Sequence, residues 1–144
     1  MNYEILEKEA NGGTITARRE TRRFLAKEAI ALGDWVAWDI SQAADGDKFL
    51  YVHKASTGAN RKACFGVAID SADAEGIVEV CIAGPVHALV KSTVNAQDAL
   101  KITGVAGEAD ITTTNDLDPC IGRALEGYIA MGSGGTLCWV HRKY

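Results

Sequence analysis

The fold is decided by residues 63–84, which read ACFGVAIDSADAEGIVEVCIAG. Two apolar runs, residues 64–69 and 77–83, flank a polar connection at 70–76 whose small and acidic residues favour a turn. The alternation of side chains along both runs is typical of strands that bury at least one face. This stretch therefore predicts a β-hairpin and an all-β core.

A weaker copy of this hairpin begins 56 residues later. Residues 120–124, CIGRA, follow the pattern of residues 64–68, CFGVA, and both are followed by a glycine-containing connection and a strand that carries a cysteine. A turn that starts a strand precedes each unit, at residues 33–36 and 97–100. We interpret this as a degenerate duplication, two halves that close into one small barrel or sandwich. The alternative is that such short sequence similarities arise by chance in a β protein rich in glycine and alanine, without a duplication.

The length and composition predict one globular domain. The chain has 144 residues and 15.3 kDa, with 47% hydrophobic and 24% charged residues, which excludes a wholly disordered chain. No apolar run approaches the roughly 20 residues that span a bilayer, and residues 1–9 lack the basic flank and apolar run of a signal peptide. We therefore expect synthesis in the cytoplasm and no membrane partner.

Residues 1–28 differ in character and are expected to form an N-terminal arm ahead of a single β domain at 29–144. They carry Arg18, Arg19, Arg22 and Arg23 in a protein of net charge −4. Arginine suits acidic partner surfaces, so we interpret these residues with Phe24 as an arm that docks on such a surface. The alternatives are a solvated charged edge, with Phe24 entering the core, and contacts to nucleic-acid phosphates. Nucleic acid is the least favoured partner because no aromatic residue interleaves the arginines.

The tryptophans are candidates for contacts between subunits. Residues 35–40, WVAWDI, predict a strand that is apolar on both faces near its start. Such a strand is either central to the core or presents a tryptophan to a partner subunit, since large aromatic residues are enriched in interface centres. The candidate oligomer interface comprises Trp35, Trp38 and Trp139.

Signals for catalysis or metal binding are weak. The four cysteines include no Cys-x-x-Cys pair and suit small core residues of a reducing compartment, and the three histidines are scattered. The sequence contains no Gly-x-Ser-x-Gly elbow, no His-Glu-x-x-His and no nucleotide fingerprint. Its paired carboxylates fall in predicted turns. We therefore expect no enzyme, and no catalytic, cofactor-binding or metal-binding residue.

The order of several short motifs resembles the small decoration, or cement, proteins of tailed-phage heads. These motifs are GDWV at 33–36, FGVA at 65–68, GIVEV at 76–80, AGPV at 83–86, DAL at 98–100 and IGRALE at 121–126. The resemblance covers about residues 29–142. The arginine-rich segment, the three tryptophans and the four cysteines depart from the family pattern.

The resemblance implies a non-catalytic all-β protein without a cofactor that binds the major capsid protein on the outer surface of an expanded head. It also implies self-association, commonly as a homotrimer, and stabilisation of the shell. No family residue is motif-defined, so none is carried over to this chain. The alternative is a carbohydrate- or protein-binding β module of a phage tail or fibre. Deletion of residues 1–23 is expected to leave a folded domain that binds capsids much more weakly.

Overall fold

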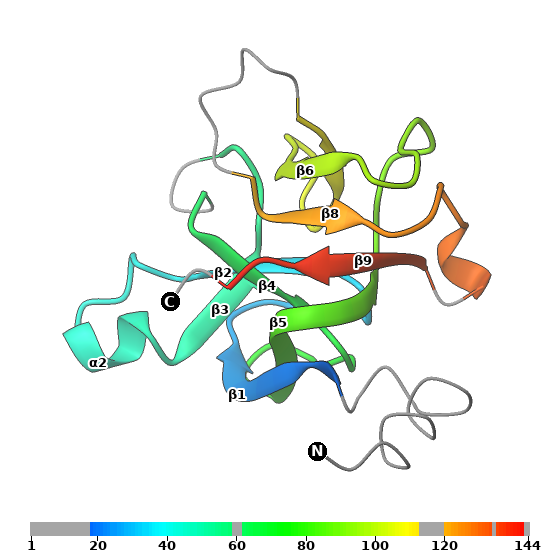
Figure 1. The fold of residues 1–144 in the computed structure, drawn as a ribbon. Helices are drawn as coiled ribbons and strands as arrows, with labels where there is room; N and C mark the ends of the chain where they lie inside the picture. The colour runs from blue at the N-terminus through cyan, green and yellow to red at the C-terminus, as the bar shows by residue number, and fades with distance from the viewer. Residues whose placement is uncertain (1–17, 59–61, 113–119, 134, 143–144) are drawn as a thin grey trace, which may run out of the picture.

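The computed structural model describes residues 18–58, 62–112, 120–133 and 135–142 (Figure 1). These residues form a nine-stranded sheet in the order β1-β3-β2-β4-β5-β9-β8-β6-β7. The strands are β1 (Glu20–Ala26), β2 (Trp35–Trp38), β3 (Tyr51–Lys54), β4 (Cys64–Ala68), β5 (Ile77–Ala88), β6 (Ala99–Ile102), β7 (Ala109–Ile111), β8 (Gly122–Ala124) and β9 (Thr136–Val140). A one-turn helix, α2 (Asp45–Lys48), and a 3-10 turn, η2 (Met131–Ser133), lie in the connections. The all-β prediction is confirmed.

The first half of the chain closes into a five-stranded barrel. β1 pairs parallel with β3 and antiparallel with the first part of β5, and β2 and β4 complete the ring. Along each strand, side chains that point into the barrel alternate with side chains that point outward, because successive residues of a strand face opposite sides. The apolar core of this first barrel consists of Ala26, Ile30, Val36, Val52, Phe65, Ala68, Val78 and Val80.

The second half begins on the same strand. β5 runs on past residue 83, pairs with β9 over residues 84–88, and β8, β6 and β7 follow in the sheet. One parallel bridge, Val90 to Ala109, brings β7 back beside the end of β5, so this half also curls into a ring. Figure 1 shows β5 passing from one ring to the other.

Gly84 and Pro85 are residue types common in turns, but here they do not turn the chain. Both residues lie inside the 12-residue strand β5. Gly84 has φ +102°, and a Cβ there would lie 2.6 Å from the carbonyl oxygen of Arg18. Glycine therefore lets the strand bend against the chain ahead of β1. The bend redirects β5 from the first ring into the second because β1 and β9 pair with it on either side of this point.

Matching hydrogen bonds support the predicted duplication. The Gly33 amide donates to the Ala68 carbonyl at 2.9 Å, and the Gln97 amide donates to the Ala124 carbonyl at 2.8 Å. The backbone at Gly33 and Gln97 has φ +91° and +76° in the two turns. The following Asp34 and Asp98 carboxylates accept from the amides three residues earlier, at 2.9 and 2.8 Å.

Both predicted hairpins are confirmed as antiparallel pairs, β4 with β5 and β8 with β9. The sequence predicts that the two halves close together into one small barrel or sandwich, and in the structure they do not. Each curls into its own ring, and β5 belongs to both.

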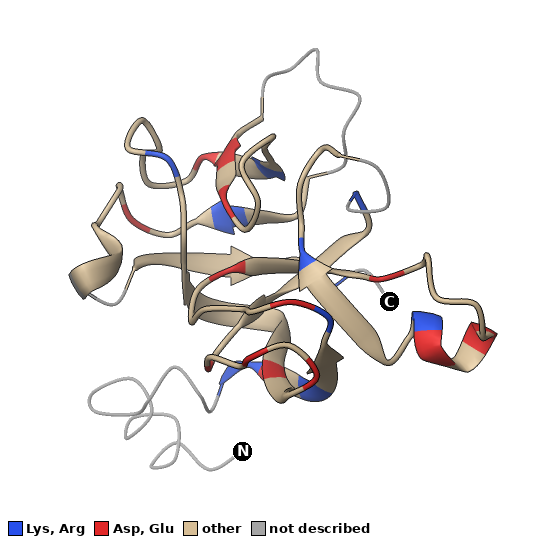
Figure 2. Ribbon diagram, turned by 180° about the vertical axis from the view of Figure 1, so that it is seen from behind, with Lys and Arg blue, Asp and Glu red and all other residues tan. Residues whose placement is uncertain are grey.

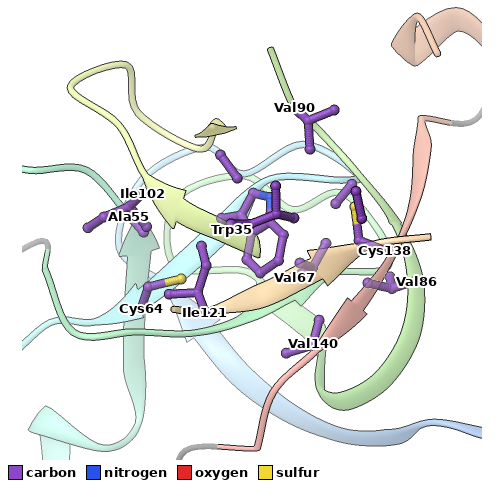
Figure 3. Close-up of a cluster of buried hydrophobic side chains, with 14 of the residues drawn as sticks. Trp35, Ala55, Cys64, Val67, Val86, Val90, Ile102, Ile121, Cys138 and Val140 are labelled. Atoms are coloured by element: carbon purple, nitrogen blue, oxygen red, sulfur yellow. The ribbon is translucent and has the colours of Figure 1, made fainter. Parts of the chain in front are cut away.

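Trp35 joins the two barrels. Its side chain starts on β2 of the first barrel, is fully buried, and belongs to the cluster that fills the second barrel (Figure 3). The indole Nε1 donates to the Leu89 carbonyl at 3.1 Å. The interior of the first barrel is filled by the bulky side chains of Phe24, Trp38 and Phe65. By strand register, the equivalent residues of the second barrel are Ala88, Ile102 and Ile121. These smaller residues leave the room that Trp35 occupies.

The expected arm, residues 1–28, does not end where we placed its boundary. Residues 1–17 lie outside the described residues, but Glu20–Ala26 is strand β1 of the first barrel. Phe24 and Ala26 pack with the barrel interior, whereas Arg23 and Leu25 alternate with them. The corrected β domain therefore begins with β1, because the first part of β5 needs this strand to close the ring.

Candidate interaction surfaces

The predicted arginines lie at and before the start of the barrel. Arg18 and Arg19 precede β1, and Arg22 and Arg23 are exposed on it. The Arg22 guanidinium lies 3.1 Å from the Glu20 carboxylate, which also accepts from Arg142 at 2.7 Å. Figure 2 shows basic residues at this end of β1. The start of β1 thus carries a basic edge, in which Arg22 and Arg142 pair with Glu20 and Arg18, Arg19 and Arg23 are close in sequence.

Phe24 is not available for a partner in the way we had predicted. Its ring packs edge-on against Phe65, with the ring centroids 5.1 Å apart, and contributes to the core of the first barrel. The alternative in which Phe24 enters the core describes this residue correctly.

The three tryptophans have different environments. Trp35 is fully buried within the chain, so its assignment to an oligomer interface was wrong. Trp38 stacks on Phe65 with the centroids 4.6 Å apart and is half-buried, so it too serves mainly the first barrel. Trp139 on β9 is 43% exposed and keeps the predicted role open.

Trp139 lies on an outward sheet face, which we call the Trp139 face. Its cross-strand partners are the buried Pro85 on β5 and the exposed Arg123 on β8. Next along β9, Leu137 pairs with His87 and lies beside Leu125, which is 44% exposed. Arg123 is exposed and donates to the Gln97 carbonyl at 2.6 Å. The Trp139 face is therefore aromatic at its centre, with the guanidinium of Arg123 on one side and His87 on the other.

The first barrel carries a second exposed apolar patch, which we call the Leu25 surface. Leu25 on β1 is the register partner of Tyr51 on β3 and of Ile77 on β5, and its amide donates to the Leu50 carbonyl at 2.9 Å. Ile77 is 64% exposed and Leu50 is 42% exposed. Sequence reasoning missed this surface, although the apolar Ile77 directly opposite an outward-facing Leu25 would reveal it once β1 is known to pair with β5.

Acidic groups flank the Leu25 surface. The negative charge of Glu75, followed by burial, raises the pKa of the Tyr51 phenol, and Asp47 contributes in the same direction. Lys27 lies over the Tyr51 ring at 4.9 Å and pairs with Glu75 at 3.3 Å. The phenol therefore lies within the field of two carboxylates.

A pocket of about 340 Å³ opens at one mouth of the first barrel. Lys54 contributes its ammonium group, which lies 3.7 Å from the Asp34 carboxylate. Burial raises the pKa of Asp34, and the Ala31 amide and Lys54 oppose that shift. The remaining lining is small: Ala29, Ile30, Ala31, Ser71, Ala72 and Asp73. This arrangement offers one ion pair and no nucleophile with an adjacent base.

The cysteines of the described chain are free thiols. Burial raises the pKa of Cys81 to about 11 and that of Cys138 to about 12, so both are unreactive core residues. Cys120 is half-buried, with its sulfur 3.7 Å from Nδ1 of His141. Among the described residues no three His, Cys, Asp or Glu side chains gather into a metal site. Within the same residues no helix has the length and apolarity to cross a membrane.

Comparison with known proteins identifies the fold. No protein-family model and no curated protein sequence matches the chain. Among solved structures, the chain is similar to the crystal structure of the N base of head fiber gp8.5 from bacteriophage phi29, with a TM-score of 0.51 and 19% sequence identity. The similarity covers 84% of this chain and 92% of the other. At this identity the comparison shows a shared fold.

Proposed function

We propose that this protein is a structural component of a tailed-phage head, a decoration protein that binds the outer surface of the shell as an oligomer and stabilises it. The observation that carries the proposal is the fold shared with the base of a phage head fiber over nearly the whole of that base. The order of motifs that resembles head decoration proteins supports it independently. The protein would be made in the host cytoplasm, bind the major capsid protein, and act without catalysis or cofactor.

The basic edge is the proposed contact with the shell. It has five arginines and one paired carboxylate, Glu20, in a chain of net charge −4, so an acidic partner surface would be attracted to this end of β1. Weak single contacts suffice on a repeated lattice, because an oligomer that spans several shell subunits gains avidity through effective concentration.

Quantification of particles tests the proposal directly. Heads purified from the source phage are separated by gel electrophoresis, and this 15.3 kDa chain is measured against the major capsid protein. Decoration predicts a copy number near that of the shell protein. A few copies per particle would replace decoration by a fibre or tail role, and absence from particles would refute both.

We predict that the double substitution Arg22→Glu and Arg23→Glu weakens binding to undecorated heads by at least about tenfold at low salt, because it reverses two exposed charges of the basic edge. The difference should shrink as salt is raised, since exposed charges are screened. Co-sedimentation with heads measures the affinity. The pair Lys62→Glu and Lys91→Glu makes the same change in net charge elsewhere and should bind as the unmodified protein does.

The corrected start of the β domain changes the deletion test. Removal of residues 1–23 would remove half of β1 and open the first barrel, so loss of binding would not report on a contact. Removal of residues 1–17 leaves β1 complete. If that deletion alone abolished head binding while the double arginine variant bound normally, the contact would lie in residues 1–17 and not on the basic edge.

A carbohydrate- or protein-binding module of a fibre is the second candidate. The comparison with a fibre base and the exposed indole of Trp139 favour it, because an aromatic ring with a neighbouring guanidinium can hold a sugar face. Glycan binding that disappears in Trp139→Ala, together with unchanged head binding, would establish this second role.

A further inference from the structure

We infer that copies of this chain associate head to tail, the Trp139 face of one copy docking on the Leu25 surface of the next. The inference deepens the proposed function, on which it rests for its biological setting, by naming the two surfaces of the oligomer.

The Trp139 face has a covered counterpart within the chain. On the first barrel, Trp35, Val67 and Cys81 face outward from β2, β4 and β5 and are completely buried within the cluster that fills the second barrel. Register pairs place Val67 beside Cys81 in the first barrel and Arg123 beside Trp139 in the second. The same face of the barrel is therefore an interface in one half and open in the other.

The Leu25 surface also has a covered counterpart. The second barrel receives Trp35 at two backbone carbonyls: Leu89 accepts from the indole, and Gly107 accepts from the Trp35 amide at 3.0 Å. The Lys27 amide donates to the Val52 carbonyl at 2.8 Å, and the Lys91 amide donates to the Ala109 carbonyl at 3.0 Å, so these two hydrogen bonds are equivalent. Two residues earlier on each segment, Leu25 is therefore the equivalent of Leu89, and Leu50 is the equivalent of Gly107. Gly107 is buried beneath the first barrel, whereas Leu50 is 42% exposed.

Each copy thus leaves open the equivalents of both sides of its internal contact between barrels. Ala99 is the equivalent of Trp35, so a contact between copies would use the exposed Trp139 and not an indole inserted into a barrel. The first barrel covers the second around Leu89 and Gly107, but the equivalent side of the first barrel, around Leu25 and Leu50, is open. The face of the first barrel that holds Val67 and Cys81 is covered, whereas the equivalent face of the second barrel, with Arg123 and Trp139, is open. Exposed large apolar residues lie on both, with Ile77 at 64% and Trp139 at 43% exposure. A second copy of the chain is the occupant that carries the matching surface for each.

Charge favours contact between unlike surfaces. The Trp139 face carries the guanidinium of Arg123, and the Leu25 surface carries Asp47 and the ion pair of Glu75 with Lys27. Two Trp139 faces brought together about a two-fold axis would oppose their Arg123 side chains, which disfavours a symmetric dimer. A contact between two different surfaces is heterologous, so it closes into a ring or continues as a filament.

The test uses the purified full-length protein without heads, so its result is separate from head binding. Sedimentation velocity is measured over a range of concentrations for two variants. The first combines Trp139→Ala with Arg123→Glu and disables the Trp139 face, and the second is Ile77→Lys, which disables the Leu25 surface. We expect the unmodified protein to form assemblies, and each variant to raise the dissociation constant at least about tenfold.

Mixing the two variants gives the decisive measurement. Each retains the surface that the other lacks, so an equimolar mixture should form a complex of two chains and nothing larger. Val105→Lys changes another apolar residue, 56% exposed in the turn after β6, and should assemble normally. Circular dichroism checks that all variants fold. The inference is overturned if the unmodified protein stays monomeric, if either variant assembles normally, or if the mixture stays monomeric.

Discussion

Trp35 shows how one side chain can serve two cores. It leaves the first barrel from β2 and fills space that the smaller residues of the second barrel leave, while its indole satisfies the Leu89 carbonyl. A tryptophan usually has to find a partner for its N–H when it is buried, and here that partner lies on the other barrel. The residue therefore fixes the second barrel against the first both by packing and by a hydrogen bond.

At this scale we predict that Trp35→Ala lowers the free energy of unfolding by about 3–5 kcal/mol, the range for emptying a buried aromatic site. Trp35→Phe should cost less, since it retains most of the packing but leaves the Leu89 carbonyl without its donor. Urea denaturation followed by circular dichroism measures both. Tyr128→Ala is the control on an aromatic residue that is 44% exposed and should cost less than about 1 kcal/mol. Equal losses at Trp35 and Tyr128 would show that Trp35 does not hold the barrels together.

Among the elements, β4 and β8 are equivalent strands that each require a glycine at close approach. A Cβ at Gly66 would lie 2.4 Å from the Cys81 carbonyl oxygen, and a Cβ at Gly122 would lie 2.4 Å from that of Trp139. The glycine of the repeated motif Cys-x-Gly is therefore explained by close backbone contact with the next strand of each hairpin.

We predict that Gly66→Ala and Gly122→Ala each destabilise the protein by about 1–3 kcal/mol, because the added methyl group must displace backbone. Thermal unfolding measures the effect. Gly46→Ala in α2 is the control, since nothing lies within 4 Å of its added Cβ and alanine is the better helix former. A loss at Gly46 as large as at Gly66 would contradict the close-approach explanation.

The sequence predicts the elements whose signals lie in neighbouring residues. It does not predict those whose conformation depends on pairing with a strand that is distant in the sequence. The two hairpins followed from alternation and turn residues, and both are present. The arginines of β1 predict a charged arm, and only the pairing of this strand with β5 shows that Phe24 faces inward. Gly84 and Pro85 are residues typical of turns, and nothing nearby in the sequence reveals that β1 and β9 hold this segment extended.

The candidate surfaces depend even more on the whole molecule. All three tryptophans look alike as interface candidates in the sequence, and burial by the other barrel is what removes Trp35 from that set. The Leu25 surface escaped prediction for the complementary reason. Its apolar residues come from β1, β3 and β5, which the sequence does not bring together, and they are exposed because the second barrel covers a different side of the first.

For the molecule as a whole we predict a single unfolding transition. The two barrels share β5 and the Trp35 site, so neither keeps its core when the other opens. Circular dichroism and tryptophan fluorescence should give the same midpoint in urea. Two separated transitions, or a stable folded fragment that ends at residue 83, would show that the barrels are independent domains.

The shared strand also determines how a further barrel could be added to such a chain. Because the last strand of the first barrel becomes the first strand of the second, the repeating unit joins its neighbour without a linker. A third barrel built in the same way would need β9 to continue past Val140 as β5 continues past Ala83, with a bend like that at Gly84. It would also need a buried indole on the second barrel in the role that Trp35 has on the first.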